Sequence, residues 1–264
     1  MNNIALGRYI PMNTVIHNLD PRYKIMAMLT LMVAVFLPSG FYGYSIIAVF
    51  VFVVLLLAKV KIQMIVRALR PMIFMLSFLL VINILIIRTG YVLVSFQGFT
   101  IYSDAIFQTL YITVRLFLMI IISTLLTIST KPLDMTLGLE DLLGVFKRFG
   151  FPAHEVAMMI SIALRFIPTL IDETSRIMKA QASRGVDLKE GSFKEKIMAI
   201  LSLIVPLFVS SFQRAEELAD AMEARGYAPS AKRTRYKQLK TTYKDVIAMG
   251  LVLSLLGGII WISL

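Results

Sequence analysis

The sequence twice places an arginine directly before a glycine where a long helical pattern ends, in Ser183-Arg184-Gly185 and in Ala224-Arg225-Gly226. Glycine is favoured just past a helix end, and an arginine in the last turn suits the negative end of the helix dipole. Either pair alone therefore indicates a helix stop. A cation at the tip of a rigid helix can also dock into an acidic groove of a partner. The repetition of the pattern favours two contact sites.

Catalytic chemistry finds little support in the sequence. There is no cysteine and there are two histidines, His17 and His154, which excludes thiol nucleophiles, cysteine–zinc sites and iron–sulfur clusters. The phosphate-binding pattern G-x-x-x-x-G-K-[ST] is missing, and the acidic residues are scattered among basic ones rather than clustered as a hydrolase would need. We therefore expect a protein that is not an enzyme and that binds no metal or cofactor itself.

The composition indicates an integral membrane protein. Of the 264 residues, 58% are hydrophobic and 16% are charged, whereas soluble domains have about 45–50% apolar and about 25% charged residues. The net charge of +11 would suggest nucleic acid in a soluble protein. Here residues 131–244 contain 18 of the 27 basic residues but also 13 of the 16 acidic ones. We therefore expect a lipid bilayer as a partner and no nucleic acid.

Five apolar stretches predict about five membrane-spanning helices, over residues 26–37, 41–58, 72–87, 105–128 and 246–264. Residues 88–104 are expected to form a loop. The linker 59–70 carries four basic residues and no acidic one, so the positive-inside rule places it in the cytoplasm together with the N-terminus and residues 131–244. The predicted organisation is a membrane domain over 1–130, a cytoplasmic domain over 131–244 and a C-terminal transmembrane helix over 245–264.

The cytoplasmic segment is expected to hold a short helix over 137–149 and two long amphipathic helices over about 153–183 and 192–224. Ser192 and Glu195 have the spacing of a capping box. Pro168 and Pro206 lie inside the two long patterns and should kink both helices. The uncharged stretch 197–212 is open to two interpretations, and a helix half-submerged at the membrane surface is favoured over a sixth span.

Arg115 interrupts the fourth apolar stretch. A functional role is the default hypothesis for a charge inside a membrane, but a structural contact between helices, or snorkelling toward an interface, is favoured because the spans offer no matching acidic residue. Asp20 is expected to cap the helix that follows it. His17 is assigned no chemistry.

The ordered set of motifs resembles the transmembrane T-component of energy-coupling factor (ECF) transporters, the CbiQ/EcfT family. The two Arg-Gly ends match the family's pair of Ala-Arg-Ser/Gly motifs, with Ser183 in place of the first alanine. The resemblance runs over essentially the whole chain. The other matching segments are Gly7-Arg8-Tyr9-Ile10-Pro11, His17-Asn18-Leu19-Asp20-Pro21-Arg22-Tyr23-Lys24 and Arg165-Phe166-Ile167-Pro168-Thr169-Leu170.

The resemblance implies a subunit of the prokaryotic cell membrane that joins two cytoplasmic ABC-type ATPases to a small substrate-binding S-component. ATP and Mg would be bound by the ATPases. The two long helices would cross as coupling helices, and the tips at Arg184 and Arg225 would each enter a groove of one ATPase. The usual substrates are vitamins, with cobalt or nickel as the minority alternative.

The apolar stripes of the same helices would then face the S-component. Packing of these side chains against the spans is an equally strong interpretation, residue by residue. The side chains in question are Phe166, Leu170, Phe208 and Phe212.

A stand-alone secondary transporter or channel subunit is the alternative function. It predicts paired polar groups within the spans or inverted repeats, and the sequence shows neither convincingly.

Overall fold

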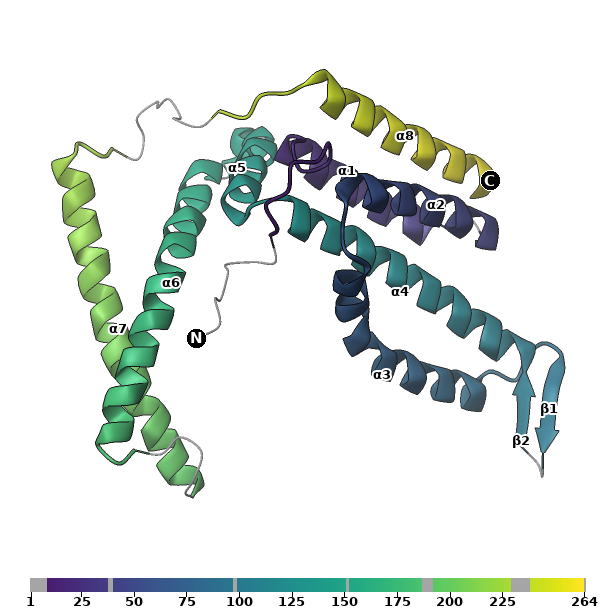
Figure 1. Ribbon diagram of the computed structural model, residues 1–264, viewed down its shortest axis with the longest axis horizontal. Coiled ribbons are helices and arrows are strands. Elements are labelled where there is room, and N and C mark those ends of the chain that lie inside the picture. Colours follow the sequence, from purple (N-terminus) through teal and green to yellow (C-terminus); the bar gives the residue numbers. More distant parts are fainter. Residues whose placement is uncertain are drawn as a thin grey trace. The chain divides into compact units, whose positions relative to one another are not determined.

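Long apolar stretches form helices here because a backbone in lipid must satisfy its polar groups internally. The computed structural model describes residues 9–37, 40–96, 99–150, 152–186, 192–228 and 238–263 (Figure 1). The elements in chain order are α1 (Pro21–Phe36), α2 (Gly40–Ala58), α3 (Ile62–Ile86), β1 (Val92–Phe96), β2 (Phe99–Tyr102), α4 (Ser103–Ser129), α5 (Pro132–Leu143), the 3₁₀ helix η1 (Gly144–Phe149), α6 (Ala153–Ser183), α7 (Phe193–Ala224) and α8 (Tyr243–Ser263).

The helical membrane fold expected from the sequence is confirmed. Within the described residues, six helices are long and apolar enough to cross a membrane, namely α2, α3, α4, α6, α7 and α8. The first expected span corresponds to α1, which has 16 residues and is shorter than these six. All six, including the long helices α6 and α7, qualify by length and composition alone.

The chain divides into two compact units. The membrane unit contains α1 to α5, the β-hairpin and α8, and the helix-pair unit contains η1, α6 and α7. In the membrane unit α1 contacts α4 and α8, and α4 also contacts α2 and α3. The C-terminal helix therefore packs beside the first helix.

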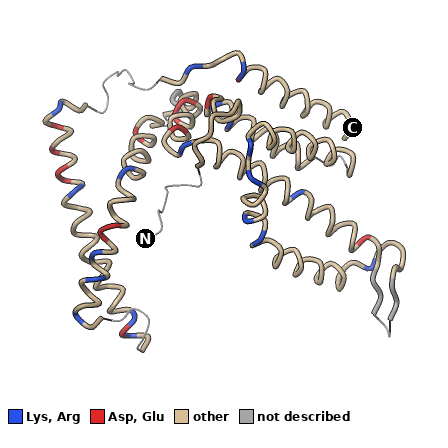
Figure 2. The backbone as a smooth tube through the Cα atoms, in the orientation of Figure 1, with Lys and Arg blue, Asp and Glu red and all other residues tan. Residues whose placement is uncertain are grey.

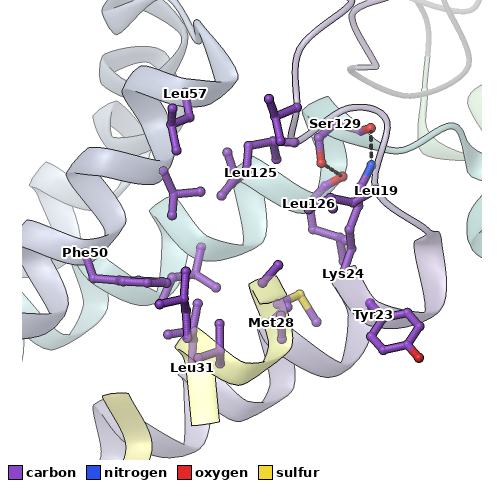
Figure 3. Close-up of a pocket in the computed structure, with 18 of the residues that line it drawn as sticks. Leu19, Tyr23, Lys24, Met28, Leu31, Phe50, Leu57, Leu125, Leu126 and Ser129 are labelled. Atoms are coloured by element: carbon purple, nitrogen blue, oxygen red, sulfur yellow. Dashed lines mark hydrogen bonds between the residues drawn. The ribbon is translucent and has the colours of Figure 1, made fainter. Parts of the chain in front are cut away.

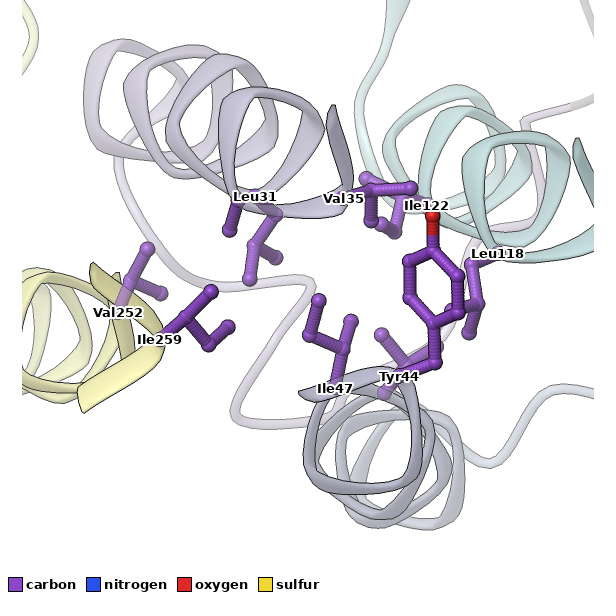
Figure 4. Packing of buried hydrophobic residues seen from close by; sticks show 10 residues of the cluster. Leu31, Val35, Tyr44, Ile47, Leu118, Ile122, Val252 and Ile259 are labelled. Atoms are coloured by element: carbon purple, nitrogen blue, oxygen red, sulfur yellow. The ribbon is translucent and has the colours of Figure 1, made fainter. Parts of the chain in front are cut away.

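A cluster of buried apolar side chains holds four helices of the membrane unit together (Figure 4). Val35 of α1, Ile47 of α2 and Ile259 of α8 are fully buried in it. Tyr44 of α2 is also buried, and its hydroxyl accepts a hydrogen bond of 2.8 Å from Nε of Arg115 on α4. Arg115 thus makes the contact between helices that the sequence favoured.

Polar groups join the ends of three helices at one end of the membrane unit. The Asp20 carboxylate caps α1, as expected, by accepting a hydrogen bond of 2.9 Å from the Arg22 backbone N–H. The buried Asp245 carboxylate accepts backbone hydrogen bonds from Asp20 (2.8 Å) and Thr242 (2.6 Å). The Lys24 ammonium donates to the carbonyl of Ser129 at the end of α4 (3.0 Å, Figure 3). These bonds satisfy helix-end groups that would otherwise be buried without partners.

Two segments differ from the sequence-based expectation. The 88–104 region contains an antiparallel hairpin, with Val92 opposite Tyr102 and Phe96 opposite Phe99, because its β-branched and aromatic residues favour strands. The 59–70 linker is helical from Ile62 onward, so α3 begins well before the third apolar stretch. Its charged residues lie among apolar residues at helical spacing, and charge alone does not end a helix. The short helix expected over 137–149 begins earlier, as α5, and continues as η1.

Replacing Asp245 by alanine is expected to destabilise the membrane unit. The change leaves two backbone N–H groups without their acceptor, which should lower the free energy of unfolding by about 2 kcal/mol. Thermal unfolding in detergent, followed by circular dichroism, measures the effect. The exposed Asp172 provides the control, and equal stability of Asp172→Ala and Asp245→Ala would contradict the assignment.

Stability is also expected to fall as the pH drops from 7.5 to 5.5, through His17. Burial, followed by the charge of Lys24, lowers the pKa of the His17 imidazole below its ordinary value of 6.5, and Nε2 is buried without a partner among the described residues. The unfolded chain therefore takes up a proton at a pH where the folded chain does not, and stability is lost below about 6.5. His17→Gln should flatten this dependence between pH 7.5 and 5.5, while His154→Gln should preserve it.

Candidate functional site

Both arginines predicted as contact residues occupy the C-cap position of a long helix. Arg184 follows α6 with φ −90° and ψ 5°, and Arg225 follows α7 with φ −87° and ψ 8°. The glycine after each arginine has a left-handed backbone, with φ +83° at Gly185 and +72° at Gly226. Both helices end at the residues expected, Ser183 and Ala224.

The same pair of backbone hydrogen bonds closes both helices. After α6, Gly185 N–H donates to the carbonyl of Ala182 (3.0 Å) and Val186 N–H donates to that of Gln181 (3.0 Å). After α7, the corresponding bonds run from Gly226 to Glu223 (2.8 Å) and from Tyr227 to Met222 (2.9 Å). This is the Schellman motif, in which a residue with positive φ lets the chain turn back over the last carbonyls. The two tips are therefore one structural motif built twice.

The two guanidinium groups are available to a partner. Arg184 and Arg225 are exposed, and neither guanidinium has a hydrogen bond or an ion pair with any residue that the structure describes. A Cβ atom placed on Gly185 or Gly226 would meet no atom within 4 Å. The backbone beside each arginine is consequently open to close approach.

The helices α6 and α7 form an antiparallel pair that places the two tips at opposite ends (Figure 1). Near the end of α6, Gln181 Nε2 donates to the carbonyl of Ser202 near the start of α7 (3.1 Å). Further along, the Glu173 carboxylate accepts from Ser210 Oγ and pairs with Arg214, both at 2.5 Å. Each helix is about 45 Å long at 1.5 Å per residue. One helix pair thus presents two equivalent cations at its opposite ends.

These crossing contacts were not found from the sequence. Glu173, Ser210 and Arg214 are ordinary polar residues on amphipathic helices, and no spacing within one chain indicates which residues face each other across two helices. Opposite charges on the two helical patterns were the only feature of the sequence that could have indicated which residues pair across the helices. Figure 2 shows basic and acidic residues spread along α6 and grouped toward the two ends of α7, so that signal did not select a pair.

The four apolar residues expected to face a membrane partner separate into two groups. Phe166 and Leu170 line a groove of about 370 Å³ against Leu218 and other α7 residues. Phe208 and Phe212 are 62% and 61% exposed, and their rings lie 4.7 Å apart in a tilted arrangement. Phe208 and Phe212 are therefore the pair free to meet a partner in this structure.

The remaining expectations for the long helices concern their starts and their prolines. The capping box is confirmed, because the Ser192 N–H donates to the Glu195 carboxylate (2.7 Å) and the Glu195 N–H donates to Ser192 Oγ (3.4 Å). Pro168 and Pro206 lie inside α6 and α7, and both helices continue past them. The expected kinks stay a prediction. The stretch 197–212 is part of the continuous helix α7.

A second hollow lies in the membrane unit, between α1, α2, α4 and α8 (Figure 3). It has a volume of about 390 Å³ and is lined mainly by apolar side chains such as Leu31, Phe50 and Leu125. Lys24 borders it, but its ammonium already donates to the carbonyls of His17 (2.9 Å) and Ser129 (3.0 Å). The described residues contain no group of three or more acidic or histidine side chains that could hold a metal ion. This pocket therefore lacks the convergent polar groups of a reaction site.

Alanine in place of Gly185 or Gly226 is expected to weaken the corresponding helix end. Because a Cβ atom has free space at both positions, the cost comes from the left-handed backbone alone and amounts to roughly 1 kcal/mol. Hydrogen exchange at the Val186 and Tyr227 amides should accelerate about five-fold. Gly250→Ala is the control, since Gly250 lies inside α8 with equal space and no positive φ; unchanged exchange in both tip variants would refute the cap assignment.

Comparison with known proteins identifies the family to which this chain belongs. The CbiQ family model, described as "Cobalt transport protein", matches residues 12–236. The chain is 41% identical over 252 residues to the energy-coupling factor transporter transmembrane protein EcfT of Staphylococcus aureus, an alignment that covers 96% of this chain and 94% of that protein. It is 42% identical over 245 residues to EcfT of Bacillus subtilis (93% and 92% covered) and 42% identical over 266 residues to EcfT of Thermosediminibacter oceani (99% and 100% covered). The chain therefore belongs to the CbiQ family, together with the EcfT transmembrane components of energy-coupling factor transporters.

Proposed function

We propose that this chain couples two cytoplasmic ATPases to a small substrate-binding membrane protein, the S-component, in an ATP-driven importer for micronutrients such as vitamins. The observation that carries the proposal is the pair of matching tips. Two exposed arginines, Arg184 and Arg225, occupy the same cap geometry at opposite ends of one antiparallel helix pair. Two equivalent contacts suit two copies of one kind of partner.

Each tip has the chemistry to hold an acidic groove. An arginine presents five N–H donors in a planar fork that matches carboxylates, and neither guanidinium is paired with a residue that the structure describes. The glycine beside it offers an open backbone. A partner that binds both the guanidinium and the glycine backbone fixes the position and the orientation of the helix end.

The helix pair then transmits movement. When the two ATPases close around ATP and Mg²⁺, the distance between their grooves changes, and the two tips follow. The polar contacts of Glu173 with Ser210 and Arg214 keep the helices together during this movement. The exposed aromatic side chains of Phe208 and Phe212 contact the S-component and pass the displacement to it. In this scheme the chain performs no catalysis and binds no cofactor, since ATP hydrolysis takes place on the partners.

The scheme fits a multi-pass protein of the prokaryotic cell membrane with the helix pair on the cytoplasmic side. The four basic residues of the 59–70 region, which carries no acidic residue, favour this orientation under the positive-inside rule. The relatives are themselves described as energy-coupling factor transporter proteins.

Charge reversal at both tips tests the proposal. Arg184→Glu together with Arg225→Glu should reduce co-purification of the ATPases and substrate uptake at least ten-fold, because each acidic groove would face a carboxylate. Each single variant should retain one ATPase copy, counted by native mass spectrometry of the gently solubilised complex. Lys240→Glu with Lys244→Glu makes the same charge change at two exposed positions away from the tips and should preserve assembly. Full uptake and two bound ATPases in the double tip variant would disprove the coupling role.

A further inference from the structure

Residues 59–71, which we name the basic segment, connect α2 to the part of α3 that packs beside α4. They contain four cations, Lys59, Lys61, Arg67 and Arg70, while the sequence has no carboxylate between Asp20 and Asp104. All four side chains are exposed, and none forms a hydrogen bond or ion pair with a residue that the structure describes. The charge of this segment is not neutralised within the described chain.

The backbone holds the first of these cations in an unfavourable conformation. Lys59 has φ +53° and is the only non-glycine residue with positive φ in the described part of the chain. It ends α2 as Gly185 and Gly226 end the coupling helices, with Lys59 N–H bonded to Leu56 (3.1 Å) and Val60 N–H to Leu55 (3.4 Å). Glycine would fit this position without strain. This position therefore carries a cation where glycine would cost less, which is consistent with a use for the charge of Lys59.

The direction of the basic segment differs from that of the spans. Figures 1 and 2 show the first turns of α3 bending away from the rest of the helix, which runs beside α4. Pro71 lies inside α3, and it removes a backbone hydrogen bond and crowds the carbonyl four residues earlier, which explains the bend. A hydrogen bond of 2.9 Å from Asn83 Nδ2 to Thr109 Oγ1 ties the later part of α3 to α4. When the later part of α3 follows α4 through the bilayer, the first turns of α3 lie at a large angle to the membrane normal.

The first turns of α3 are amphipathic. Gln63, Arg67 and Arg70 recur at intervals of four and three residues and share one face of the helix. Ile65 and Leu69 share the opposite face. Ile62, which flanks the apolar face, is 75% exposed. Ile65 and Leu69 are partly exposed, and a partly exposed apolar face opposite a row of unpaired cations suits the boundary between acyl chains and headgroups.

We propose that the basic segment lies along the cytoplasmic membrane surface and binds the headgroups of anionic phospholipids. Lys59, Lys61, Arg67 and Arg70 contact the lipid phosphates, and the face of Ile65 and Leu69 enters the upper acyl region. Cations near an anionic leaflet gain a favourable interaction that is additive over a cluster. The site fixes the depth of α3 in the bilayer and gives the protein a preference for anionic lipid.

Lipid selectivity provides the first test. The full chain is placed in phosphatidylcholine vesicles that contain trace spin-labelled phosphatidylglycerol or spin-labelled phosphatidylcholine, and the motionally restricted fraction of each is measured. The wild-type protein should prefer phosphatidylglycerol, and high salt should weaken this preference. Changing Lys59, Lys61, Arg67 and Arg70 to Gln should reduce the preference about five-fold or more, the factor expected even for a single cation near the surface.

A matched variant controls for the loss of four positive charges. Lys179, Lys194, Lys196 and Lys240 are exposed outside the basic segment, and changing all four to Gln should leave the preference intact. The proposal is overturned if the basic-segment variant keeps its preference, or if both quadruple variants lose it equally. It is also overturned if the wild-type chain shows no preference, which would instead favour an acidic protein partner for these cations.

Membrane depth provides a second test that keeps all four cations. Because the chain has no cysteine, Gln63→Cys and Ile65→Cys each create a unique site for a spin label. Collisions with oxygen should dominate at position 65, and collisions with a water-soluble nickel complex should dominate at position 63. Equal nickel accessibility at both positions would show that the segment projects into water, and deep burial of both labels would show that it crosses the bilayer; either outcome refutes the proposal.

Discussion

Backbone hydrogen bonding at helix ends is the constraint on which the other features of this protein depend. A helix leaves its first N–H groups and its last carbonyls without internal partners, and in or near a membrane water cannot be relied on to satisfy them. The chain meets this demand with the carboxylates of Asp20 and Asp245, with the Lys24 ammonium and with left-handed glycines. The proposed contact sites lie at such ends as well, so closing a helix and presenting a charge are done by adjacent residues, a glycine and the arginine before it.

The parts of the fold that depend on local chemistry were predictable from the sequence. The start of α7 follows from Ser192 with Glu195, and the ends of α6 and α7 follow from the two Arg-Gly pairs, because capping is decided within four or five consecutive residues. The cap at Asp20 follows for the same reason. The start of α3 was missed because the basic residues suggested a linker, although the apolar residues around them recur at helical spacing. The hairpin was missed because Gly90 and Gly98 suggested a loop more strongly than the intervening Val and Phe suggested strands.

The parts that depend on two distant segments meeting were not predictable. The sequence showed that Arg184 and Arg225 end two helices, but not that the helices run antiparallel and carry the arginines to opposite ends. It likewise gave no means to separate Phe166 and Leu170, which face α7, from Phe208 and Phe212, which are exposed. Arg115 was expected to contact another helix, yet its partner Tyr44 lies 71 residues away in the chain.

The distribution of contacts along the helix pair has a mechanical consequence. Hydrogen bonds and an ion pair join α6 and α7 between Gln181 and Glu173 on one helix and between Ser202 and Arg214 on the other. Beyond Arg214 the facing surfaces are separated by an apolar groove instead. The two helices are thus joined close to the tip of α6 and far from the tip of α7. Gln181 lies just before Arg184, whereas Arg214 lies about three turns before Arg225. In the proposed coupling movement, an equal displacement of the two tips would therefore rotate the two helices by unequal angles.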